Sequence, residues 1–162
     1  MPGLIATIYA TPNAGTPLHS VVEATLETGK GLVGDRYYEG GGTFSEKLRN
    51  SSDWEITLIE LEEIERFNQL EKLALPAGDF RRNIVTRGAR LNELVGSRST
   101  VGSALLEGMR LCEPRKNRSE RGRPTRRSGR DTARLIRWPA TCCHTADMSP
   151  IHSGNLDCSD EP

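Results

Sequence analysis

Residues 78–114, GDFRRNIVTRGARLNELVGSRSTVGSALLEGMRLCEP, decide the fold class of this chain. Runs of strand-forming residues at 83–86, 99–101 and 104–111 alternate here with single glycines. Glycine adopts the backbone conformations that tight turns need, so this pattern is typical of short strands joined by turns. The stretch therefore predicts a β-rich domain.

The segments before this stretch add three strands, a glycine-rich loop and one helix. Residues 4–9, 18–26 and 55–59 are rich in apolar and β-branched residues and predict strands. Residues 29–42 contain six glycines, which indicates a backbone in unusual conformations or closely approached by another group. Residues 60–73 place apolar residues at helical spacing with glutamates opposite them, which predicts a helix. We expect a mainly β (α+β) fold, a distorted β-barrel with one main helix.

The character of the chain changes at Arg115. Residues 1–114 carry 12 basic and 16 acidic residues, whereas residues 115–162 carry 10 basic and 6 acidic ones and no Val, Phe or Tyr. Such a segment buries too little apolar surface to offset the entropy lost on ordering. We therefore expect an incomplete barrel domain over residues 1–114 and a disordered tail over residues 115–162, which we interpret as the product of a shifted reading frame.

The chain shows no sign of a membrane or secretory protein. No apolar run approaches the roughly 18 residues that a spanning helix needs, and the N-terminus lacks the pattern of a signal peptide. The four cysteines form no CxxC pair. These features predict a cytoplasmic protein with reduced thiols and no membrane partner, and they leave the oligomeric state open.

Six segments of the chain together resemble the MOSC domain, which occurs at the C-terminus of molybdenum cofactor sulfurases and as small stand-alone proteins. The six segments, in order, are residues 31–40 (GLVGDRYYEG), 56–60 (ITLIE), 80–88 (FRRNIVTRG), 91–96 (LNELVG), 101–108 (VGSALLEG) and 111–114 (LCEP). The resemblance implies a barrel pocket that holds the molybdenum cofactor, a molybdopterin. It implies sulfur transfer or the reduction of N-hydroxylated compounds, and by family association pyridoxal phosphate binding. The implied partners are a small-molecule substrate, the pterin cofactor and a redox or sulfur-donor protein.

Four residues are candidates for holding the cofactor. Arg36 follows Asp35 in the glycine loop, where Asp35 could orient the guanidinium toward an anion or bind loop amides; the alternative is a surface turn. If a strand begins at Arg81, alternation places Arg81 and Asn83 on one face and Arg82 on the other. Arg81 would then offer a fork for phosphate, and Asn83, which matches the family motif best, would donate and accept hydrogen bonds. The alternative is that Asn83 stabilises a turn.

The expected molybdenum thiolate is missing from its usual position. In the small MOSC proteins that this chain resembles, the corresponding strand ends with the sequence CEPC, and the second cysteine is expected to bind molybdenum or carry sulfur. In this chain Cys112, Glu113 and Pro114 match that sequence, but position 115 is Arg. Arginine stays protonated and cannot ligate a metal. Cys112 is the substitute candidate for both the catalytic and the metal-binding role, although a lone strand cysteine is more often a small buried apolar residue.

Two further functions compete with the molybdenum enzyme. Without its thiolate, the chain would be a truncated and catalytically inactive barrel. The basic run at 115–137 could instead bind nucleic acid or an acidic partner, but it contains no aromatic residue for base stacking, so nucleic acid is disfavoured. The cysteines and histidines of the tail match no zinc-module spacing. An incomplete barrel would also leave strand 104–111 with an unpaired edge.

Overall fold

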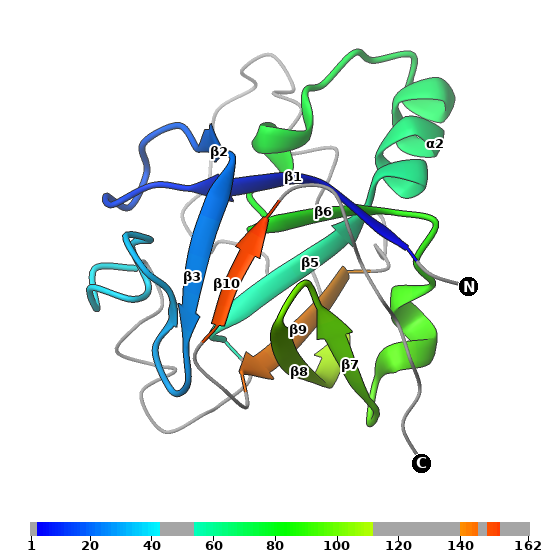
Figure 1. Cartoon of the computed structure of the whole chain (residues 1–162). Coiled ribbons are helices and arrows are strands. Elements are labelled where there is room, and N and C mark those ends of the chain that lie inside the picture. Colours follow the sequence, from blue (N-terminus) through cyan, green and yellow to red (C-terminus); the bar gives the residue numbers. More distant parts are fainter. Residues whose placement is uncertain (1–2, 43–53, 112–139, 146–148, 153–162) are drawn as a thin grey trace.

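The computed structural model describes residues 3–42, 54–111, 140–145 and 149–152, and within these ranges the chain forms ten strands, one α-helix and two short 3₁₀ helices (Figure 1). In chain order they are β1 (Leu4–Ala10), β2 (His19–Val21), β3 (Glu23–Glu27), β4 (Gly31–Leu32), β5 (Ile56–Glu60), α2 (Leu61–Glu71), η1 (Ala77–Phe80), β6 (Ile84–Arg87), η2 (Leu91–Leu94), β7 (Arg98–Val101), β8 (Ala104–Leu111), β9 (Ala140–Thr145) and β10 (Ser149–His152).

The strands form two sheets. The larger sheet has the order β2-β1-β6-β5-β9-β8-β7, with β5 and β6 parallel and the other neighbours antiparallel. The smaller sheet, β10-β3-β4, is antiparallel and lies across the face of the larger one (Figure 1). Within the described ranges no pairing joins β2 to β7, so the sheet does not close into a barrel. The predicted class, mainly β with one main helix and an incomplete barrel, is confirmed.

Two apolar cores lie on opposite faces of β5 and β6. Alternation sends Ile56, Leu58 and Ile84 into the core between the two sheets, where they meet side chains of β1, β3, β8 and β10. Ile59 and Val85 point the other way, into a second core with α2 and η1. Strands buried on both faces explain why residues 56–59 and 84–85 are almost continuously apolar.

The segment 18–26 differs from the single strand expected. It forms β2 and β3, which belong to different sheets, and Val22 between them is 78 % exposed. The chain therefore crosses from the larger sheet to the smaller one at this residue. The side-chain alternation shifts by one residue at this crossing, because Val21 packs against the same inter-sheet core as Ala24 and Leu26.

Two strands lie in the tail that was expected to be disordered. β9 is inserted between β5 and β8, and β10 pairs with β3. Strand 104–111 is consequently paired on both sides, so the expected unpaired edge at that strand is wrong. The physical reason is that backbone hydrogen bonds to existing strands can order a segment poor in Val, Phe and Tyr. The rest of the tail lies outside the described residues, and the shifted reading frame remains a prediction.

Across the described ranges, no helix combines the length and the apolar composition that crossing a bilayer requires.

Candidate functional site

The glycine loop after β3 has the special backbone that its composition predicts. Gly29, Gly31, Gly34 and Gly40 all have positive φ, a region that favours glycine. At Gly31 a side chain would also collide with the carbonyl of Glu55. These conformations turn the chain back on itself after β4 and bring residues 35–37 beside the end of β1.

Asp35 organises this loop from a buried position. Its Oδ1 accepts hydrogen bonds from the amide of Thr11 (3.3 Å) and from Nη1 of Arg36 (3.1 Å), and its Oδ2 accepts one from the amide of Tyr37 (3.2 Å). Asp35 therefore both orients the arginine and binds loop amides, the two roles considered for it from the sequence.

Arg36 is buried as well, which rules out a solvated surface arginine. Its guanidinium lies over the ring of Tyr37, 4.8 Å from the ring centroid, and its amide donates to the carbonyl of Thr11 (2.7 Å). Burial makes each contact stronger than at the surface, because water competes less for the charge. The loop thus presents a guanidinium in one orientation, fixed by Asp35 and Tyr37.

Arg81 does not belong to a strand face. It has φ of 57° and ends η1 in the left-handed conformation, and β6 begins three residues later at Ile84. The strand alternation expected from Arg81 onward therefore does not reach this residue. Its Nη1 donates to the carbonyl of Thr16 (2.7 Å), and its side chain lines a cavity of about 210 Å³. The other lining residues are Tyr9, Pro17, Leu18, Pro76, Gly78 and Asp79.

Asn83 is buried and joins three strands. Its Oδ1 accepts from the hydroxyl of Thr57 (2.9 Å), its Nδ2 donates to the carbonyl of Tyr9 (3.4 Å), and its amide donates to the carbonyl of Thr57 (3.0 Å). These bonds connect β1 and β5 through the residue that precedes β6. The geometry gives Asn83 a structural role close to the alternative considered for it, although the bonds are to strands and not within a turn.

Arg82, which is not among the candidates from the sequence, lies close enough to Arg36 for their charges to interact. Its Nε is buried and has no hydrogen-bond partner among the described residues. Burial lowers the pKa of Arg82 to about 10; the phenol of Tyr37 opposes this shift, and the charges of Arg36 and Arg110 add to it. Arg82 therefore stays protonated at neutral pH among neighbours that repel its charge.

Arg110 reaches the same region from β8. Ala104, Leu106 and Gly108 are the buried residues of this strand, and a bulge between Gly108 and Arg110 interrupts their alternation before the half-buried Arg110. Its Nη1 donates to the carbonyl of Leu111 (3.4 Å). No sequence pattern marks Arg82 or Arg110 as site residues, because the left-handed conformation of Arg81 sets where the extended backbone before β6 begins and a bulge interrupts β8 before Arg110.

The thiolate candidate is Cys112. Cys112 and Arg115 lie outside the described residues, so the metal and catalytic roles of Cys112 stay predictions. Within the described ranges, no three His, Cys, Asp or Glu side chains gather as a metal site. The described part of the site is therefore the buried Asp35–Arg36 pair beside Tyr37, with Arg82 close enough to Arg36 for their charges to interact.

No protein-family model matches the sequence, and no curated protein matches it in sequence. Solved structures, in contrast, match over most of the chain. The YuaD protein from Bacillus subtilis superimposes with a TM-score of 0.73 at 14% identity, covering 96% of this chain and 94% of YuaD. YiiM from Geobacillus stearothermophilus gives 0.63 at 14% identity, covering 98% and 75%. YiiM from Escherichia coli gives 0.60 at 15% identity, covering 100% and 71%. At this identity the match establishes the fold alone, and that fold is MOSC-like.

Proposed function

We propose that this protein binds the molybdenum cofactor beside the glycine loop and uses it for sulfur transfer or for the reduction of N-hydroxylated compounds. The observation that carries the proposal is the Asp35–Arg36 pair, buried within the segment that resembles the first MOSC motif. A buried arginine whose orientation is set by a carboxylate and a ring is prepared to receive an anionic group before that group arrives.

The residues present fit the anionic part of such a cofactor. Arg36 retains guanidinium donors beyond the one that Asp35 accepts, and the buried Nε of Arg82 lacks a partner among the described residues. Both groups favour a phosphate over a neutral ligand. When bound, the molybdenum centre would supply the sulfur-transfer or two-electron chemistry. Asn83 supports this arrangement indirectly by joining β1, β5 and the start of β6.

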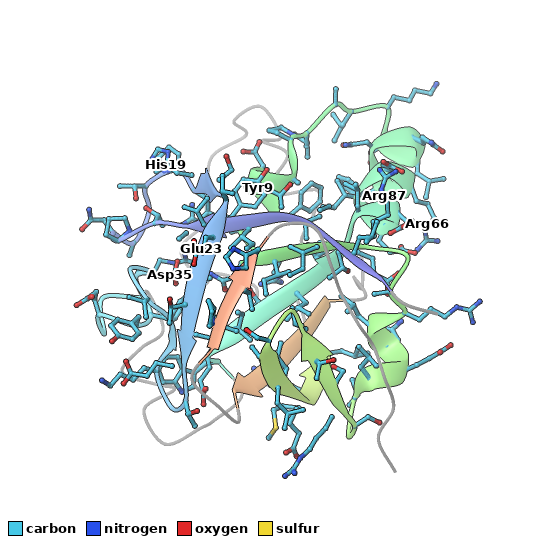
Figure 2. All side chains as sticks on the ribbon, viewed as in Figure 1. Tyr9, His19, Glu23, Asp35, Arg66 and Arg87 are labelled. Carbon is cyan, nitrogen blue, oxygen red and sulfur yellow. The ribbon has the colours of Figure 1, made fainter. Side chains whose placement is uncertain are left out.

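The direct test is the molybdenum and pterin content of the purified chain. We expect close to one pterin per chain, and we expect Arg36→Met to lose most of it because the buried cation is gone. Arg66→Met, on the exposed surface of α2 (Figure 2), is the matched control and should retain the wild-type content. Pyridoxal phosphate is the competing ligand; its release on acid treatment in place of pterin would contradict the molybdenum assignment.

The Cys112→Ala variant separates an active protein from an inactive one. If Cys112 replaces the family thiolate, the variant keeps its pterin, which arginines hold, but loses molybdenum-dependent turnover. Bound pterin with no turnover in the wild-type chain would instead indicate the inactive barrel that Arg115 suggests.

A further inference from the structure

We propose that Thr11 and Thr16 are positioning residues, which couple the side chain of Arg81 to the buried pair that the proposed function assigns to the cofactor. That pair is Asp35 and Arg36, so the inference rests on the proposed function. The two threonines belong to the loop that connects β1 to β2. Hydrogen bonds run from this loop to both sides, to the glycine loop and to the residue that ends η1.

At one end of the coupling, the backbone of Thr11 is bound to the Asp35–Arg36 pair. Its amide donates to Oδ1 of Asp35 (3.3 Å), and its carbonyl accepts from the amide of Arg36 (2.7 Å). Thr11 is only 1 % exposed, so little water competes for these bonds. The position of Thr11 therefore helps to determine where Arg36 lies.

Two hydroxyl groups connect Thr11 to Thr16. Their Oγ1 atoms are 2.6 Å apart, and Oγ1 of Thr16 also donates to the carbonyl of Asn13 (2.8 Å). A hydroxyl has one proton to donate, and that of Thr16 goes to Asn13, so Thr11 is the donor between the two threonines. The buried hydroxyl of Thr11 thus holds Thr16 in place.

At the other end, the carbonyl of Thr16 accepts from Nη1 of Arg81 (2.7 Å). The backbone of Arg81 has φ of 57°, a conformation that residues other than glycine keep only where their surroundings hold them in it. Thr16 is therefore one of the contacts that fix the orientation of this guanidinium.

The consequence is that one loop sets the orientation of two arginines that are far apart in the sequence. Arg36 meets the loop through its backbone, and Arg81 meets it through its guanidinium. Charged groups that are held in place before a ligand arrives lose less entropy when it binds. The loop between β1 and β2 thereby prepares both arginines together.

Valine substitutions separate this positioning from plain stability, because valine keeps the shape of threonine and lacks the hydroxyl. Thr16→Val leaves the buried hydroxyl of Thr11 without its acceptor and should lower the midpoint of urea denaturation. The double variant Thr11→Val/Thr16→Val removes both hydroxyls and should recover most of that loss, but it still lacks the coupling. Thr11→Ser keeps the hydroxyl and should restore wild-type behaviour in every measurement.

Amide hydrogen exchange in the cofactor-free full chain measures the coupling itself. Arg81→Met should accelerate exchange of the Arg36 amide at least about threefold, because Thr16 loses the donor that holds its carbonyl. In the double valine background the same substitution should have no effect on that amide. Rates are compared with the amide of Gly108, which donates to the carbonyl of Ser97 (3.0 Å) away from this loop.

Thr86→Val is the matched control. Thr86 is fully buried, and its hydroxyl donates to the carbonyl of Ile59 (3.3 Å), on a strand that does not touch the loop between β1 and β2. This variant should be less stable than the wild type, yet its Arg36 amide should exchange at the wild-type rate relative to Gly108. The proposal is overturned if Arg81→Met leaves the Arg36 amide unchanged, or if it acts equally in the double valine background.

Pterin content distinguishes this inference from the proposed function. In a pterin-loaded chain, Thr16→Val and the double variant should lower the content, whereas Thr11→Ser and Thr86→Val should retain it. Coupling in a chain that never contains pterin would refute the proposed function alone. A pterin-loaded chain in which Arg81→Met does not affect the Arg36 amide would refute this inference alone.

Discussion

Gly31 occupies a position where backbone conformation and crowding both demand glycine. Its φ is 90°, and an added Cβ would collide with the carbonyl of Glu55. Gly29, two residues earlier, also has positive φ (78°), but open space surrounds the place where its Cβ would be. We predict that Gly31→Ala lowers the free energy of unfolding by about 3 kcal/mol or more, and Gly29→Ala by about 1 kcal/mol. Urea denaturation measures both, and equal losses would show that the contact with Glu55 is not tight.

Glu60 makes stability depend on pH at the start of α2. Burial raises the pKa of this carboxyl above its ordinary 4.5, helped by nearby Glu63 and Glu62 and opposed by the hydrogen bond from the amide of Leu91. A raised pKa means that the folded state binds the proton more tightly than the unfolded chain does. Ionisation therefore costs stability, and the cost develops as pH rises from the ordinary value through the raised one.

We predict that Glu60→Gln removes this part of the pH dependence, because the amide oxygen can still accept from Leu91 without a charge. At pH 7 the variant should be more stable by less than about 1 kcal/mol, since solvent screens the half-buried carboxyl and the dipole of α2 favours its charge. Below about pH 4 the two proteins should be equally stable. Thermal unfolding across this pH range measures the effect. A wild-type advantage at neutral pH would contradict it, and Glu71→Gln, which removes an exposed carboxyl at the far end of α2, is the control.

The candidate site could be predicted in part at this scale. Asp35 and Arg36 are adjacent in the chain, so their pairing depends on local geometry that a glycine-rich loop signals. The role of Arg82 depends on which of three consecutive residues begins the extended backbone. The left-handed conformation of Arg81 determines where the extended backbone begins, and no residue type in this stretch predicts that conformation.

Among the elements, α2 was predictable because its apolar face has a clear helical period. Ile64 and Phe67 are buried, whereas Leu70, at a position continuing the same period, is 68 % exposed, because α2 ends at Glu71 and no element of the described ranges covers its last turn. The split of residues 18–26 into β2 and β3 was not predicted, although the alternation shifts by one residue at the consecutive Val21 and Val22.

Phe67 should account for most of the stability that α2 contributes. Its ring is 1 % exposed and meets the ring of Phe80 edge to face, with centroids 5.8 Å apart. We predict that Phe67→Ala lowers the free energy of unfolding by about 3–5 kcal/mol, through lost burial and the cavity left behind. Leu70→Ala, on the same helix, should change it by less than about 0.5 kcal/mol. Chemical denaturation compares the two, and a comparable loss in both would mean that the last turn is covered.

At the scale of the whole molecule, the tail completes the two sheets. Composition alone predicted disorder after residue 114. Composition indicates how much apolar surface a segment can bury, but it does not indicate whether other strands have unpaired edges with which the segment can form backbone hydrogen bonds. β9 satisfies backbone groups of both β5 and β8, and Ile151 of β10 is fully buried in the inter-sheet core. Pairing between strands that are far apart in the sequence depends on the assembled sheet, so a short stretch of sequence gives little indication of it.

A chain that ends at residue 139 lacks both β9 and β10. Removing β9 and β10 would leave β5 and β8 each without a neighbour on one side and would open the inter-sheet core where Ile151 lies. Exposed edges of that kind promote association between chains. We predict that the chain ending at residue 139 loses the cooperative melting transition and aggregates, whereas a chain ending at residue 152, which keeps both strands, melts cooperatively as a soluble species. Calorimetry with size-exclusion chromatography distinguishes the two. If the chain ending at residue 139 melts as cooperatively as the longer one, β9 and β10 are not part of the stable sheets and residues 1–114 fold without them.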